Sequence, residues 1–122
     1  LFENMVIVEL MKYRFNGGLD HGLYFFRDDK QHEVDVIMPS GADLVGIEIK
    51  SALTFHQDFL KGLKHIRHVF KKKTVRSIVV YAGAEAQSGD EFSLLNYQDT
   101  AGIFEKRFGQ LRGNHEKENV SA

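Results

Sequence analysis

Two short segments on either side of a turn constrain the fold most. EVDVIM (Glu33–Met38) alternates charged and apolar side chains, PSGAD follows, and LVGIEIK (Leu44–Lys50) alternates again. Strict alternation is the pattern of β-strands whose two faces meet different surroundings. A short turn that contains glycine favours an antiparallel pairing of the two strands. The sequence therefore predicts a β-hairpin over residues 33–50.

The predicted hairpin brings acidic side chains together. We expect it to close around Gly41–Ala42, with a loop of two or four residues. Counting back along both strands then sets Asp35 opposite Glu48. In the same register Glu33 lies opposite Lys50. Opposed residues bring their Cβ atoms to about 4.5–5.5 Å, and two carboxylates that close repel each other unless a proton or cation lies between them. Mg²⁺ binds through one or two carboxylates, so the pair is a candidate metal site.

Lys50 follows Glu48 by two residues and therefore shares its face of the strand. A lysine there could polarise a water or stabilise negative charge on a phosphate. The same charges have a simpler interpretation, because many antiparallel sheets expose one face to water. A bulge or an odd loop would also remove the pairing. Spacing alone slightly favours the simpler interpretation.

The rest of the chain predicts one α/β domain. We expect helices at residues 1–14, 56–72 and 101–111, and strands at 23–27, 75–83 and 92–95 beside the two hairpin strands. The first helix is apolar nearly all round, which predicts packing on more than one side. The order αβββαβ predicts a central mixed sheet flanked by helices. The domain should span residues 1–112, followed by a polar tail at 113–122.

Composition excludes several classes of protein. The chain has 122 residues, 43% of them hydrophobic and 27% charged, which is typical of a soluble globular domain. A net charge of −1 gives no global attraction to nucleic acid or membranes. Without cysteine the chain can form neither disulfides nor thiolate metal sites, which fits a cytoplasmic location. No apolar run approaches the roughly 20 residues that span a bilayer. The chain begins inside a helical pattern without an initiator Met, so we interpret it as part of a longer protein.

Positive charge gathers in one stretch that contains no acid. Its members are Lys61, Lys64, Arg67, Lys71, Lys72, Lys73 and Arg76. Such a surface could hold a nucleic-acid backbone. The solvated face of an amphipathic helix explains it equally well. His65 and His68 lack a partner acid at metal-ligand spacing, so no zinc site is expected there. His32 could approach the carboxylates, although a surface position in a turn is the simpler expectation.

Asp35 followed by Glu48-Ile49-Lys50 resembles the D…(D/E)xK signature of the PD-(D/E)xK, or restriction-endonuclease-like, nuclease superfamily. The segments LFENMVIVEL, LYFFRDDKQHEVDVIM, GIEIKSA and VVYAG resemble more closely an uncharacterised domain found C-terminal to the ATPase core of prokaryotic AAA+-like ATPases. This resemblance covers Leu1 to about Tyr97. It implies a restriction-endonuclease-like αβββαβ core with a Mg²⁺ (or Mn²⁺) site.

In that site the resemblance gives each residue a role. Asp35 and Glu48 match the metal ligands and Lys50 assists catalysis. In several branches a glutamate of the first helix joins the metal site, which here would be Glu3. Glu3 also lies on a partly apolar helix stripe, although an acid is favourable in any first turn. Val34 stands where the superfamily commonly has proline.

The resemblance implies Mg²⁺-dependent hydrolysis of nucleic acid, with DNA favoured over RNA and the basic residues Lys61, Lys64, Arg67, Lys71, Lys72 and Lys73 contacting the backbone. The resemblance also implies a partner, an ATPase domain of the same parent chain. This chain has no G-x-x-x-x-G-K-[ST] loop, so ATP binding would belong to that domain. The alternative is a catalytically inactive nuclease-fold module that binds nucleic acid or protein and targets the ATPase. The sequence leaves homo-oligomerisation open.

Overall fold

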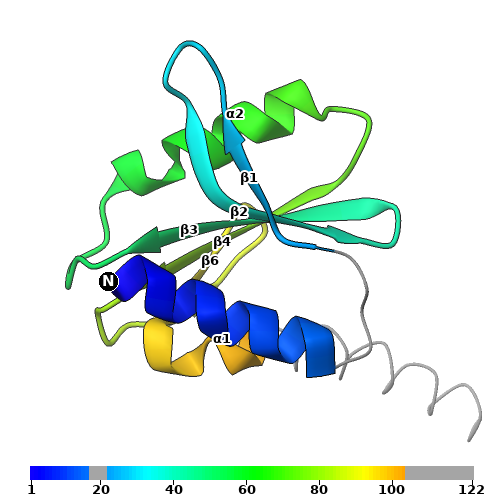
Figure 1. Ribbon diagram of the computed structural model, residues 1–122. Coiled ribbons are helices and arrows are strands. Elements are labelled where there is room, and N and C mark those ends of the chain that lie inside the picture. Colours follow the sequence, from blue (N-terminus) through cyan, green and yellow to red (C-terminus); the bar gives the residue numbers. More distant parts are fainter. Residues whose placement is uncertain (17–21, 104–122) are drawn as a thin grey trace, which may run out of the picture.

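A computed structural model describes residues 1–16 and 22–103 of the chain, and it shows a mixed sheet between helices (Figure 1). The helices are α1 (Phe2–Asn16), η1 (Gln57–Leu60), α2 (Lys61–Val69) and η2 (Tyr97–Asp99), where η marks a 3₁₀ turn. The strands are β1 (Tyr24–Arg27), β2 (Glu33–Ser40), β3 (Asp43–Lys50), β4 (Val75–Tyr81), β5 (Gln87–Ser88) and β6 (Ser93–Asn96). The predicted order αβββαβ and the α/β class are confirmed.

The six strands form one sheet in the order β1-β2-β3-β4-β6-β5. β1, β2 and β3 pair antiparallel, whereas β3 pairs parallel with β4 and β4 with β6. The parallel pair β3–β4 needs a crossover, which α2 provides. β5, which pairs antiparallel with β6, was not predicted. Its two exposed residues carry no apolar alternation that could have indicated a strand.

The hairpin closes as predicted, with Ser40 paired to Asp43 around a two-residue loop. Gly41 takes a φ of +60°, which suits a hairpin turn with glycine at its first loop position. The strands are longer than expected because Pro39 belongs to β2 and pairs with Leu44. Proline has no backbone N–H to donate to a neighbouring strand. This is tolerated on the β1 side of β2, because the pairing of β1 with β2 ends at Ile37, before Pro39.

Each face of the sheet carries a hydrophobic core. On one face α1 packs through Val6 and Leu10 onto strand residues that include Ile47. On the other face α2 packs through Leu63 and Ile66, both almost fully buried. Figure 1 shows the two helices on opposite sides of the sheet, with α2 above it and α1 below. The arrangement is a three-layer α/β/α domain.

The apolar outer side of α1 is not covered as the sequence predicted. Met5, Val8 and Met11 are 46%, 49% and 41% exposed, so in the described residues α1 packs on one side only. Of the helix predicted at 101–111, residues 101–103 are helical and the rest lies outside the described residues, as do the domain boundary at 112 and the tail. Among the described helices, none has the length and apolar character that crossing a membrane requires.

Candidate functional site

A β-bulge in β2 shapes the site. Phe26 of β1 pairs with Val34, but Tyr24, two residues earlier, pairs with Ile37, three residues later. β2 therefore has one extra residue in this interval, which includes Asp35. The bulge also explains why Val34 and Ile37 both face α2, where simple alternation predicts opposite faces. Bulges commonly re-aim a side chain next to a functional site.

At the bulge the carboxyl groups of Asp35 and Glu48 replace backbone carbonyls as the acceptors of hydrogen bonds between β2 and β3. The regular pairing ends at Val36 and Ile47. Beyond it the backbone N–H of Asp35 donates to Glu48 Oε1 at 3.1 Å, and the N–H of Ile49 donates to Asp35 Oδ2 at 2.8 Å. The predicted register thus brings the two acids together. At this point, however, backbone N–H groups donate to the two carboxylates, where we expected backbone-to-backbone hydrogen bonds between the strands.

Lys50 lies beside this pair, with its Nζ 3.5 Å from Glu48 Oε2. The Lys50 side chain is 40% exposed and its ammonium lies 5.6 Å from the ring centre of Phe59. The lysine can therefore reach both Glu48 and solvent. Glu33, expected opposite Lys50, instead forms an ion pair with Arg27 of β1 at 2.6 Å.

Burial makes the two acids weak. Burial raises the pKa of Glu48 from 4.5 to about 7, and repulsion from Asp35 adds to it, although Lys50 and the Asp35 N–H act in the opposite direction. Burial also raises the pKa of Asp35, which the hydrogen bond from Ile49 opposes. Glu48 is 6% exposed and is the buried charged residue of the described core. A cation between the carboxylates would relieve the cost of ionising both.

Asp35, Glu48 and Lys50 line one polar pocket of about 300 Å³ on the α2 side of the sheet. Its wall is formed by Lys30, Gln31, His32, Glu33, Asp35, Glu48, Lys50, Asp58, Phe59, Lys61 and Gly62. The pocket lies at the C-terminal end of β3, which runs parallel to β4. Ligands of open α/β sheets bind beyond the carboxyl ends of parallel strands. The donor set, two carboxylates and a lysine open to water, suits a hard divalent cation with an anionic ligand.

Glu3 approaches this pair from α1. Its charge and a hydrogen bond between the two carboxyl groups both raise the pKa of Asp35. Glu3 does not line the pocket on the α2 side. Among the described residues, Glu3, Asp35 and Glu48 do not form a group whose ligand atoms all lie within 4.8 Å of one another. Asp35 is thus linked to both acids, to Glu3 through its carboxyl group and to Glu48 through its backbone N–H, but the three carboxyl groups do not converge on one point.

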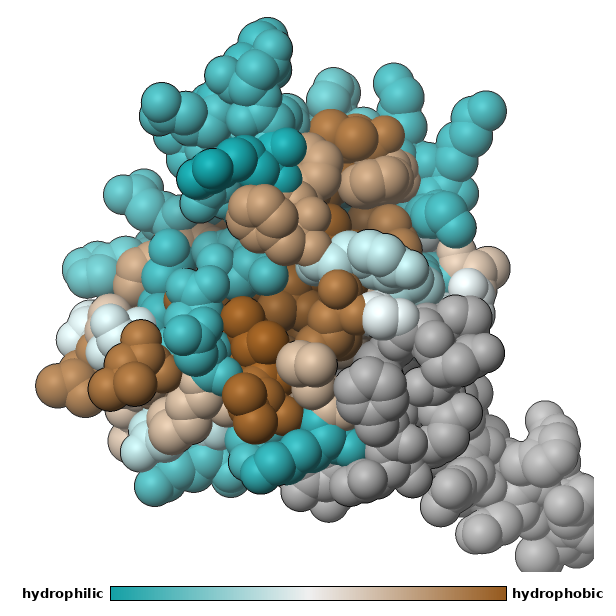
Figure 2. Space-filling view, in the orientation of Figure 1, coloured by the Kyte–Doolittle hydropathy of each residue, from teal (hydrophilic) through white to brown (hydrophobic). Residues whose placement is uncertain are grey.

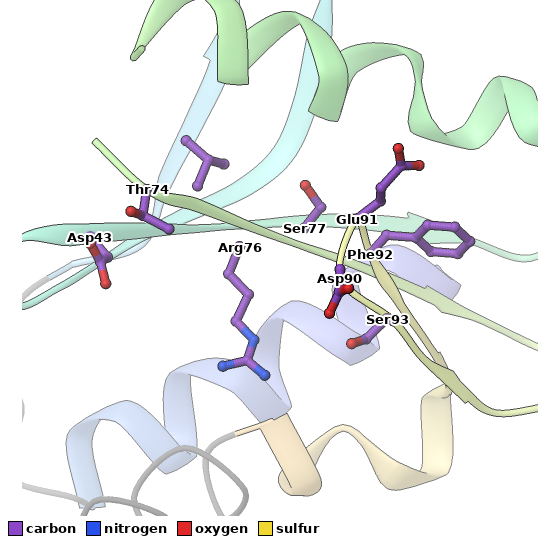
Figure 3. Close-up of a pocket in the computed structure, with 10 residues that line it drawn as sticks. Asp43, Thr74, Arg76, Ser77, Asp90, Glu91, Phe92 and Ser93 are labelled. Atoms are coloured by element: carbon purple, nitrogen blue, oxygen red, sulfur yellow. The ribbon is translucent and has the colours of Figure 1, made fainter. Parts of the chain in front are cut away.

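The basic stretch divides between the two faces of the sheet. Hydrophilic side chains gather over α2, at the top of Figure 2. The cluster on this side comprises Lys61, Lys64, Arg67, Lys71, Lys72 and Lys73, all exposed except the half-buried Arg67. Arg67 donates a hydrogen bond to the backbone carbonyl of Glu91. Arg76 is exposed on β4 and points toward α1, away from this cluster (Figure 3).

A second pocket, of about 310 Å³, lies at the opposite end of the parallel strands (Figure 3). Asp43 and Arg76 line it together with the segment 89–93. The hydroxyl of Ser77, also in its lining, is buried without a hydrogen-bond partner among the described residues. Its lining includes the acids Asp43, Asp90 and Glu91 together with Arg76 but no lysine, so it does not repeat the arrangement of Asp35, Glu48 and Lys50.

The sequence did not predict a third cluster, formed by Asp28, His32 and His65. Their ligand atoms all lie within 4.8 Å of one another. Asp28 and His32 belong to the turn before β2 and His65 to α2. The four-residue spacing of Asp28 and His32 could have indicated two ligands of such a site. No pattern in the sequence near them indicates that α2 brings His65 to the same place.

Residues 1–99 match a protein-family model described as "Domain of unknown function (DUF4143)". Domains of this kind are found in ATPase-associated proteins. The matched range contains every described strand and the pocket residues Asp35, Glu48 and Lys50. No curated protein matches the chain.

Proposed function

The chain belongs to the DUF4143 family, and from that premise we propose that it is a metal-dependent nuclease domain. The proposed reaction is Mg²⁺-dependent hydrolysis of nucleic-acid phosphodiesters, with DNA as the favoured substrate. One observation carries the proposal: Asp35 and Glu48 interlock at the end of the hairpin with Lys50 beside them, in one polar pocket. The D…(D/E)xK resemblance of the same three residues supports it.

Each residue has a role that its environment suits. Asp35 and Glu48 would hold Mg²⁺ through carboxylate oxygens, because one oxygen of each is already fixed by a backbone N–H. A Mg²⁺ ion bound there would act as a Lewis acid toward a phosphate oxygen and would lower the pKa of a bound water. Lys50 would position that water and stabilise negative charge on the phosphate. Glu3, which is hydrogen-bonded to Asp35, would hold the ion through a water.

The cluster on α2 would hold the nucleic-acid backbone. Lys61 belongs both to this cluster and to the wall of the carboxylate pocket. A phosphate bound by the cluster can therefore lie near the proposed metal site. Contacts of this kind depend on charge and not on sequence. The partner in the cell would be an ATPase domain of the same parent chain, with which the domain would share its substrate.

Cleavage assays test the proposal. Linear, circular and branched DNA, and RNA, are incubated with the chain and Mg²⁺ or Mn²⁺. We expect cutting that EDTA abolishes and that Lys50→Ala lowers by about 10²–10³-fold, as when a transition-state donor is lost. Lys12→Ala, on α1, is the matched control and should cut normally. Absence of metal-dependent cutting on every substrate by folded protein would defeat the proposal.

A second function is favoured by a different observation. The exposed apolar side chains Met5, Val8 and Met11 give α1 a surface suited to contact with another protein. The domain would then be an inactive nuclease fold that targets the ATPase. Titration with Mn²⁺ separates the two functions, since Asp35→Asn removes binding if the carboxylates hold metal. Binding of DNA without any dependence on metal would favour the targeting module.

A further inference from the structure

We propose that Asp28, His32 and His65 form a second metal site, which binds a first-row transition-metal ion such as Zn²⁺ and joins the turn before β2 to α2. Two imidazoles and one carboxylate are ligands that Zn²⁺ commonly takes. The proposal does not depend on the nuclease activity. It uses none of the residues that we assign to Mg²⁺.

The carboxylate is held in place by the turn itself. Oδ1 of Asp28 accepts hydrogen bonds from the backbone N–H groups of Lys30 and His32, at 3.0 and 2.9 Å. The backbone closes the same turn, because the N–H of Asp28 donates to the carbonyl of His32 at 3.1 Å. Oδ2 therefore points to a fixed place. Ligands fixed by outer hydrogen bonds are typical of metal sites.

Two imidazole nitrogens converge on Oδ2 from different elements. His32 Nδ1 lies 3.0 Å from it and His65 Nε2 lies 2.9 Å from it. In a tetrahedral zinc centre with bonds of about 2.0–2.1 Å, ligand atoms lie roughly 3.3 Å apart. The two oxygen–nitrogen distances thus need to lengthen by only a few tenths of an ångström to admit an ion.

The imidazole rings need one adjustment. They are stacked, with centroids 3.7 Å apart and planes 8° from parallel. An imidazole binds a metal in its own plane, so the two rings must turn toward a common point when the ion enters. Rotation about χ2 of histidine is soft. The side chains are about one quarter exposed, which leaves room for the rotation and for water as a further ligand.

The ion would connect the turn before β2 to α2, which already meet through the stacked rings of His32 and His65. His32 also lines the pocket that contains Asp35, Glu48 and Lys50. A metal that fixes His32 to α2 would therefore fix the rim of that pocket. We expect it to be a structural ion that limits movement of the turn.

Metal titration of the purified chain tests the proposal. The background carries Asp35→Asn and Glu48→Gln, so that the carboxylate pair contributes no binding. Zn²⁺ is followed by calorimetry and Co²⁺ by its visible absorption, which becomes intense in tetrahedral sites. We expect one ion per chain. His32→Gln and His65→Gln should each weaken binding at least tenfold, with native circular dichroism.

His68→Gln is the matched control, because His68 lies three residues after His65 on α2 but is exposed. It should leave the affinity within a factor of two. A second readout is thermal unfolding: Zn²⁺ should raise the Tm of the background chain and not that of its His65→Gln variant. Failure to bind either metal would overturn the proposal. It would also be overturned by equal affinity in the His32, His65 and His68 variants.

Discussion

Glu48 is a glutamate at a depth where glutamate is seldom found. It is almost fully buried, and it accepts a backbone hydrogen bond while contacting Lys50. An apolar residue would suit this depth better, because burial of a carboxylate costs several kcal/mol unless it is compensated. A side chain that lowers the stability of its own fold is typical of functional sites.

The titration of Glu48 predicts how stability changes with pH in metal-free solution. Between pH 4.5 and about 7 the folded protein holds a proton on Glu48 that the unfolded chain has released. The free energy of unfolding should therefore fall as pH rises through this window, by up to about 3 kcal/mol at about 1.4 kcal/mol per pKa unit. The raised pKa of Asp35 acts in the same direction. Urea unfolding at pH 5.5 and pH 8 in EDTA should show about 2 kcal/mol of this change, because the part of the window below pH 5.5 is not sampled.

The variant Glu48→Gln isolates the cause. It cannot ionise, so it should lose most of the pH dependence and be more stable than the unmodified chain at pH 8 without metal. Glu85→Gln changes an exposed glutamate in the same way and should keep the pH dependence. Added Mg²⁺ should stabilise the unmodified chain at pH 8 but not the Glu48→Gln variant. An unchanged pH slope in Glu48→Gln would contradict the prediction.

At the level of the elements, the start of α2 is placed by its close approach to β2. A Cβ atom added at Gly62 would lie 1.9 Å from the carbonyl oxygen of Glu33. That oxygen belongs to the backbone just before the bulge, so it cannot move unless the bulge moves too. The absence of a side chain at Gly62 therefore lets α2 cover the pocket.

Gly62→Ala should for this reason destabilise the domain. We expect a loss of about 1–3 kcal/mol, as for other overpacked sites, measured by urea unfolding. Gly102→Ala is the control, because a Cβ atom there meets nothing within 4 Å. Residue 102 is helical, so this variant should be neutral or more stable by up to about 1 kcal/mol. Similar losses in both variants would show that the contact with Glu33 is not the reason.

For the molecule as a whole, the sequence predicted features that depend on neighbouring segments of the chain. It did not predict features that depend on how distant segments pack together. Alternation and the even loop predicted that Asp35 and Glu48 meet, because both depend on the hairpin alone. The bulge could not be predicted, since it results from the pairing of β2 with β1. Nor could the meeting of His32 and His65, which depends on how α2 packs. Arg76 was expected in one surface with the basic residues of α2, but it lies on β4 and points toward α1.

The division of positive charge between the two faces predicts a salt dependence. The net charge of −1 means that any attraction to DNA must come from a local surface. If the cluster on α2 is that surface, Lys64→Ala should weaken DNA binding and lower the slope of log K against log salt concentration by roughly 0.9. Arg76→Ala removes the same charge on the other face and should change neither. Fluorescence anisotropy between 50 and 200 mM salt measures both slopes, and equal effects of the two variants would place the DNA elsewhere.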